Sequence, residues 1–233
     1  MLIVHILAGF IGIIVAPGAM LTRKGSTWHR RWGWIYVGSM GLVASTAILL
    51  ALSPLNVFLL LLGVFSLYMT YSGVCAHGQR RARRIHLIDW LITTVVALCC
   101  AVLIVVGIQD LIAGISFGFV PLAFGALGLG LAGLDLAFYF RPDFSPATAY
   151  RRHLRMMIGS YIAMVSAFSA VNMLFLPPII RWLWPTVLGA ILIRIWSRKV
   201  DVRNAFKKQK DNSNDILSGN VADDPLEQKA DQD

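Results

Sequence analysis

Five histidines are spread over the 233-residue sequence, and their positions relative to the apolar segments indicate where chemistry could occur. Three of them, His29, His86 and His153, come directly before an apolar segment, and we expect all three on one side of a membrane. His77 follows an apolar segment on that side, whereas His5 stands alone near the opposite side. If the helices that begin at the first three histidines pack together, three imidazoles converge at one depth.

Two of these segments also resemble each other. Each contains a histidine and an arginine in the pattern H-x-R, followed by a glycine and then by a tyrosine. These residues are His29, Arg31 and Tyr36 in the first segment and His153, Arg155 and Tyr161 in the second. The tyrosine follows the histidine by seven and eight residues, close to two helical turns, so we expect both side chains near one helix face. Duplication of an ancestral helix pair and chance would both produce such an echo.

A histidine and an arginine at a helix N-terminus could bind two kinds of ligand. The unpaired N–H groups and the positive end of the helix dipole attract anions, of which a phospholipid headgroup is the simplest. The same field keeps a nearby histidine neutral, which is the form that ligates a metal ion or haem iron. We therefore expect either an interfacial anchor or a haem b or metal site whose ligands are His29 with His153 or His86.

Asp135 is an ionisable residue inside an apolar segment, six residues before Arg141. Because a charge inside a membrane span is energetically costly, we expect Asp135 to have a functional role or a charged partner. It could accept a proton or neutralise a ligated imidazole, or it could form a structural ion pair with Arg151 or Arg155. Asp89, at the start of another segment, is expected to cap a helix.

The elements that position these residues are predicted to be membrane helices. The chain is 57% hydrophobic and 14% charged, with a mean hydropathy of +0.68, whereas soluble domains carry roughly 25% charged residues. About 20 apolar residues per helix span a bilayer. We predict an all-α, seven-helix transmembrane domain over residues 1–200 and a disordered, charged tail over 201–233. The predicted spans run roughly Val4–Leu21, Trp32–Leu52, Leu55–Cys75, Trp90–Ile108, Phe117–Phe140, Met156–Phe175 and Leu183–Trp196.

The basic residues predict how the helices are oriented. With seven spans, 20 of the 21 Lys and Arg residues fall on one side, and only Arg181 falls on the other. The positive-inside rule then places the N-terminus outside and the C-terminus in the cytoplasm. Because orientation in the bilayer explains the net charge of +9, we expect no nucleic-acid partner.

The N-terminal part of the chain resembles a family of uncharacterised bacterial polytopic membrane proteins, domain of unknown function 2306. The pattern is a histidine that opens the first span, glycines along it, a basic turn, H-R, a glycine and a tyrosine. The matching residues are His5, Gly9, Gly18, Arg23, Lys24, His29, Arg30, Gly33 and Tyr36, with a second match at His153, Arg155, Met156 and Tyr161. The resemblance implies the topology and a bacterial inner membrane, and no activity.

A shorter pattern, H-R-x-x-G at His29, is similar to the haem-ligating helix entries of haem A synthases. Those entries have a glutamate upstream of the histidine, where this chain has Gly25 and Ser26. The similarity favours the haem interpretation slightly.

Two hypotheses follow for function. One is a haem b or metal-binding redox protein of the inner membrane, with a cytoplasmic-side histidine site and Asp135 beside it. The other is a non-catalytic accessory or small-solute permeation protein, whose His and Arg residues bind anionic lipid headgroups. The sequence contains no P-loop, H-E-x-x-H or G-x-S-x-G in a suitable context, so neither ATP coupling nor hydrolysis is predicted.

Overall fold

The computed structural model describes residues 1–198 and shows that this part of the chain is all-helical, as predicted. Seven helices are long and apolar enough to cross a membrane. They are α1 (Leu2–Leu21), α2 (Thr27–Ala51), α3 (Val57–Ala82), α4 (Leu87–Ile112), α5 (Phe119–Phe140), α6 (Pro146–Asn172) and a seventh helix, Pro178–Arg198; the short 3₁₀ turn η1 (Ser116–Gly118) precedes α5. The predicted tail, 201–233, lies outside the described residues. The packing described below lies within one compact unit, Met1–Ile193, and a second unit begins at Arg194.

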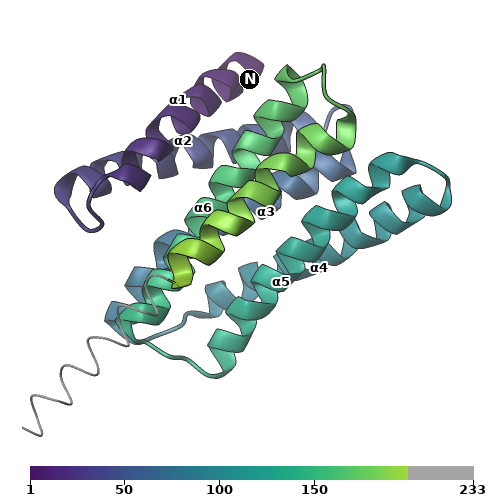
Figure 1. The fold of residues 1–233 in the computed structure, drawn as a ribbon. Helices are drawn as coiled ribbons and strands as arrows, with labels where there is room; N and C mark the ends of the chain where they lie inside the picture. Colours follow the sequence, from purple (N-terminus) through teal and green to yellow (C-terminus); the bar gives the residue numbers. More distant parts are fainter. Residues whose placement is uncertain (199–233) are drawn as a thin grey trace, which may run out of the picture. The chain divides into compact units, whose positions relative to one another are not determined.

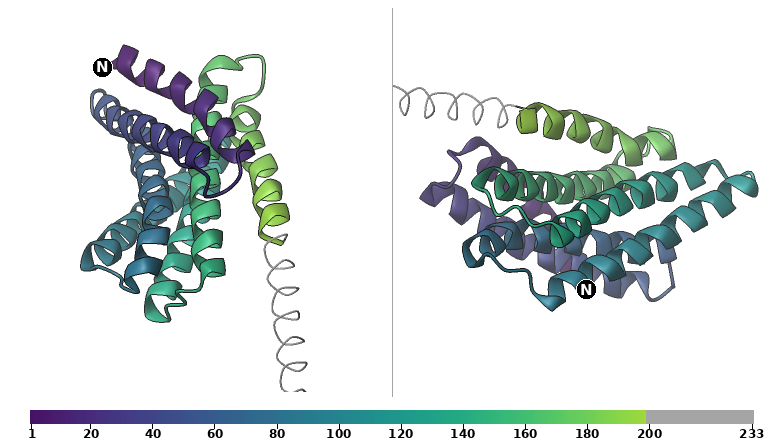
Figure 2. Two further views of the ribbon diagram at one scale, coloured as in Figure 1. Left: turned by 90° about the vertical axis from the view of Figure 1, so that its left-hand side faces the viewer. Right: turned by 90° about the horizontal axis from the view of Figure 1, so that it is seen from below.

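Helix α3 is the centre of the first unit. It packs against α2, α4, α5 and α6, while α1 pairs with α2 and α4 pairs with α5 (Figures 1 and 2). The buried residues of α3 include Phe65, Tyr68 and Met69, which join the main core cluster with residues of α4, α5 and α6. Most of the large apolar side chains that α1 and α4 leave exposed, such as Ile14 and Leu98, suit a lipid environment.

Two helices begin well before the predicted spans, because capping residues set their first turns. The Ser26 hydroxyl accepts a hydrogen bond from the His29 N–H, so α2 begins at Thr27 and not at Trp32. Ser145 caps α6 in the same way and is followed by Pro146, which is favourable in the first turn. Helix α3 likewise continues past Cys75 to Ala82. His29, His77 and His153 therefore lie on helices, and not in the loops between them.

The close contact between α4 and α5 depends on glycines that carry no side chain between the two helices. Gly118, just before α5, faces α4, because a Cβ there would lie 2.5 Å from the Gly107 carbonyl oxygen. Gly114 lies in a turn with a φ of +77°, and Gly130 faces open space. Gly125 instead faces the backbone of α4: a Cβ there would lie 2.8 Å from the Cys100 carbonyl oxygen. A Cβ at Gly128 would also overlap the Cys100 sulfur. The two helices can approach this closely only because these positions carry no side chain.

The seventh helix brings a tryptophan into the core. Pro177 lies between α6 and this helix, and Trp182 is only 9% exposed, with its ring centroid 5.1 Å from that of Phe58 and 6.1 Å from that of Phe124. Trp184 donates its indole N–H to the Ser169 hydroxyl of α6 at 2.8 Å. Aromatic packing on α3 and α5 therefore buries Trp182, so it does not lie at the membrane interface.

Because α4 and α5 are in close contact, adding a methyl group at Gly125 and at Gly133 of α5 should change the stability of the protein differently. We expect Gly125→Ala to lower the free energy of unfolding by about 1–3 kcal/mol, because backbone atoms of α4 would have to move. The matched control is Gly133→Ala on the same helix, where a Cβ meets nothing within 4 Å and the higher helix propensity of alanine should raise stability slightly. Thermal unfolding in detergent measures both variants, and equal midpoints would contradict the glycine contact.

Candidate functional site

Three histidine rings gather at one end of α2, α3 and α6. The ring centroid of His153 lies 6.3 Å from that of His29 and 5.0 Å from that of His77, with the rings edge-on in both pairs. The predicted convergence of His29 and His153 is thus present in the structure. His77 supplies the third ring of this group, which we call the histidine cluster.

Main-chain carbonyls orient two rings of the histidine cluster. The Nδ1 of His29 lies 2.8 Å from the carbonyl oxygen of Ala19, and the Nδ1 of His153 lies 2.8 Å from that of Gly73. A carbonyl oxygen only accepts, so Nδ1 carries the proton in each ring and donates it. In the neutral ring, Nε2 then keeps its lone pair. Metal-bound histidines show this arrangement, with one nitrogen held by a carbonyl and the other free to ligate.

Gly73 makes this arrangement possible. A Cβ at Gly73 would lie 2.9 Å from Met157 Cε and 3.2 Å from Met156 Cβ. The absence of a side chain therefore lets α6 approach α3 closely enough for His153 to reach the Gly73 carbonyl. The position of the imidazole is a consequence of helix packing.

His86 is not part of the histidine cluster, contrary to our expectation that the even-numbered helices pack together. It lies exposed at the start of α4, where its backbone N–H donates to the Asp89 carboxylate at 2.8 Å. Asp89 is thus the helix cap that the sequence predicted, and it also accepts from the Tyr71 hydroxyl at 2.7 Å. Among the described residues α4 packs on α3 and α5 and makes no contact with α6, which separates His86 from His153.

The remaining residues of the H-x-R echo have different environments. Tyr36 is buried, and its hydroxyl lies 2.7 Å from the Ser160 hydroxyl of α6. Its ring centroid lies 6.5 Å from that of Tyr161, whose hydroxyl donates weakly to the Ile13 carbonyl at 3.4 Å. The two tyrosines therefore meet, like the two histidines. Arg31 is exposed, with its guanidinium 5.5 Å from the centre of the Trp28 ring.

His5 lies away from the histidine cluster and has a structural environment. Its Nδ1 is 3.1 Å from the Val43 carbonyl oxygen and 3.0 Å from the Thr46 hydroxyl, both on α2. The contact ties the start of α1 to the far half of α2.

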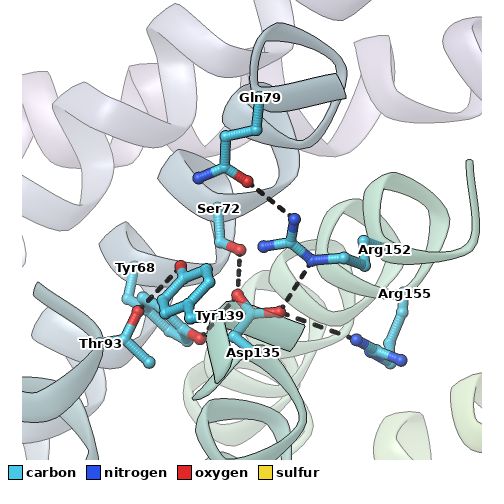
Figure 3. A network of polar contacts seen from close by, with 8 residues as sticks. All are labelled: Tyr68, Ser72, Gln79, Thr93, Asp135, Tyr139, Arg152 and Arg155. Carbon is cyan, nitrogen blue, oxygen red and sulfur yellow. Dashed lines mark hydrogen bonds and ion pairs between the residues drawn. The ribbon is translucent and has the colours of Figure 1, made fainter. Parts of the chain in front are cut away.

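Asp135 is the centre of a second, buried group of polar residues (Figure 3). Its carboxylate is fully buried, and its Oδ1 lies 3.1 Å from Arg152 Nε and 3.8 Å from Arg155 Nη2. The other oxygen, Oδ2, accepts from the hydroxyls of Tyr68 at 3.0 Å and Ser72 at 2.5 Å. Of the two partners predicted from sequence, Arg155 is present, whereas Arg151 donates to Thr148. We call these residues the Asp135 network.

Arg152 is the main ion-pair partner of Asp135, and our sequence reasoning missed it. It is 3% exposed, its Nη1 donates to Gln79 Oε1 at 2.7 Å, and its guanidinium lies 4.1 Å from the centre of the Phe138 ring. The H-x-R echo drew attention to Arg155 instead. The helical periodicity of α6 could have identified Arg152. Ser160, Met156 and Arg152 are spaced four residues apart and so lie on the same buried face of the helix.

Two charged residues in the loops beside the helix ends have shifted pKa values. Burial lowers the pKa of Lys24, whose Nζ donates to the carbonyls of Met20 at 2.5 Å and Ala19 at 3.4 Å. Hydrogen bonds from Thr148 and Ser145 lower the pKa of Asp143, so this exposed carboxylate stays ionised beside the N-terminus of α6.

The residues that could hold a metal centre are therefore few. Within residues 1–198, no group of three or more His, Cys, Asp or Glu side chains is arranged as metal ligands. The three cysteines are free, and Cys100 is buried in the contact between α4 and α5. The donor set that fits a metal centre is the pair of oriented imidazoles, His29 and His153, with His77 adjacent.

No protein-family model matches this chain, and no curated protein or solved structure matches it either.

The buried ion pair predicts strong destabilisation when one partner is removed. We expect Asp135→Ala to lower the free energy of unfolding by about 3–5 kcal/mol, because it leaves a buried guanidinium without its counter-charge. The double variant Asp135→Ala with Arg152→Ala should lose less than the sum of the two single variants. Unfolding of the detergent-solubilised protein measures all three, and strictly additive losses would show that the pair is not coupled.

Proposed function

We propose that this protein is a multi-pass membrane protein that binds a transition-metal centre, as haem b or as a single ion, through His29 and His153. The observation that supports the proposal is the hydrogen-bonding arrangement that the two rings share. They come from different helices, each has its Nδ1–H held by a main-chain carbonyl, and each keeps Nε2 available. Imidazole nitrogen is a common ligand of iron, copper and zinc. His77 replaces His86 as the third candidate.

The protein's own residues would do three things for such a centre. The carbonyls of Ala19 and Gly73 hold the tautomer and the direction of the rings, and so raise the basicity of Nε2. The contact between Tyr36 and Tyr161 keeps α2 and α6 in register about two turns further along. A haem b group bound there would supply one-electron transfer, which makes a redox role in the membrane the natural activity.

A second candidate function rests on the exposed side of the same helix entry. Trp28 is 60% exposed, and the guanidinium of Arg31 lies against it. An indole and a guanidinium in this position suit the headgroup region, where they would bind anionic lipid. In that case the protein is a non-catalytic accessory or small-solute permeation protein, and the histidines are packing residues.

Metal content and the absorption spectrum of the purified protein test the two candidates. We expect a Soret band for haem, or one transition-metal ion per chain, and at least a tenfold loss of the bound group in both His29→Ala and His153→Ala. The matched control is His86→Ala, an exposed histidine outside the cluster, which should retain the group. A colourless, metal-free protein would overturn the metal proposal, and so would equal content in all three variants.

The histidine cluster is also proposed to face the cytoplasm of a bacterial cell, in the inner membrane, from the charge distribution. In a background with Cys75, Cys99 and Cys100 replaced by alanine, Ile115→Cys should react with a membrane-impermeant thiol reagent in intact cells. Arg84→Cys, at the opposite end of α4, should react only after permeabilisation. If Arg84→Cys reacted in intact cells and Ile115→Cys only after permeabilisation, the proposed topology would be wrong.

A further inference from the structure

A half-open cavity of about 460 Å³ lies between α3, α5, α6 and the seventh helix, and no residue of the histidine cluster lines it. Its walls are almost entirely apolar, with Phe65, Phe124 and Ile162 among the lining residues. Only two polar side chains, Arg155 and Thr186, are part of the lining. The volume is within the range of about 300–1,000 Å³ that is typical of small-molecule sites.

Both polar side chains that line the cavity have unsatisfied hydrogen-bonding groups. Arg155 Nε and Thr186 Oγ1 are buried and have no hydrogen-bond partner within the described residues. A buried donor without a partner costs about 1–3 kcal/mol, and more when the group is charged. The partnerless N–H of Arg155 in an otherwise apolar cavity indicates that a polar ligand atom belongs beside it.

The charges around Arg155 are also unbalanced. Asp135 faces two guanidiniums. It accepts a hydrogen bond from that of Arg152, whereas Arg155 Nη2 lies 3.8 Å from the carboxylate, beyond hydrogen-bonding distance. One carboxylate between two arginines leaves a net charge of about +1 in a largely buried site. A monoanion would balance this charge, while a neutral or cationic ligand would not.

We infer that this cavity binds an amphiphile with a carboxylate head and a hydrocarbon tail. The carboxylate accepts from the Arg155 guanidinium, and the tail lies along the apolar walls formed by α3, α5, α6 and the seventh helix. A carboxylate fits better than a phosphate, because its single negative charge matches the excess positive charge. The inference is independent of the metal proposal, since none of the cluster histidines lines the cavity.

Binding of radiolabelled dodecanoate to the full-length protein in phosphatidylcholine nanodiscs tests the inference, with empty nanodiscs subtracted. Dodecanol and dodecyltrimethylammonium, which carry the same tail, are the neutral and cationic comparison probes. We expect saturable binding of dodecanoate at one site, at least tenfold tighter than binding of dodecanol. Equal affinity for the three probes, or no saturable binding of dodecanoate, would overturn the inference.

Two pairs of variants separate the head from the tail. Arg155→Gln should weaken dodecanoate binding about tenfold or more and leave dodecanol binding unchanged, whereas Arg155→Lys should retain part of the preference for the anion. Gly130→Leu should block all binding, because the leucine side chain would occupy the cavity that Gly130 lines. The substitution itself is tolerated, since a Cβ at Gly130 meets nothing within 4 Å.

The control for Gly130→Leu is Gly133→Leu, also on α5 and also in open space, but outside the cavity lining. It should bind dodecanoate like the unaltered protein. Because neither glycine substitution overlaps existing atoms, the pair tests the cavity even if the Arg155 variants do not fold. Equal binding in the two leucine variants would place the dodecanoate elsewhere and overturn the inference.

Discussion

The first unit is organised around one buried charge, the carboxylate of Asp135. An ionised group that is fully removed from water is stable only when opposite charge and hydrogen-bond donors surround it. Here the charge comes from Arg152 and Arg155 on α6, and the donors are Tyr68 and Ser72 on α3. Since the carboxylate itself is on α5, three helices must meet at one point. A shift of any of them by a single turn would leave a charge unpaired in an apolar interior.

The same contact between α3 and α6 also creates the histidine cluster. Arg152 and His153 are adjacent in sequence and so point about 100° apart around α6. Arg152 turns toward Asp135, while His153 turns toward α3 and the Gly73 carbonyl. Once the ion pair sets the rotation of α6, the direction of His153 follows. The third feature, the cavity, lies beside the same helix, because Arg155 is one turn from Arg152 and reaches both Asp135 and the cavity.

Sequence reasoning found His29, His153 and Asp135, because a histidine at a helix entry and a carboxylate in an apolar run are unusual in themselves. It chose His86 over His77 because it assumed that even-numbered helices are neighbours. In the structure, α4 packs on α5 and on the central helix α3 and makes no contact with α6 within the described residues. It missed Arg152 for a related reason, since a basic residue near a helix end was assigned to the interface, when the periodicity of small residues along α6 places it inside.

Hydropathy and charge by themselves determined the number and type of the helices, because crossing a bilayer requires long apolar runs regardless of how the helices then pack. Capping residues such as Ser26 and Ser145 determined where two helices begin, which is a local interaction that is also written in the sequence. Only the tertiary structure decided which side chains meet. Nothing in the sequence distinguishes Tyr68, Ser72 and Gln79 from other polar residues of α3. Their role follows from their contacts with the Asp135 carboxylate of α5 and the Arg152 guanidinium of α6. Long-range pairing of this kind depends on helix rotation and close approach at glycines, which no local pattern encodes.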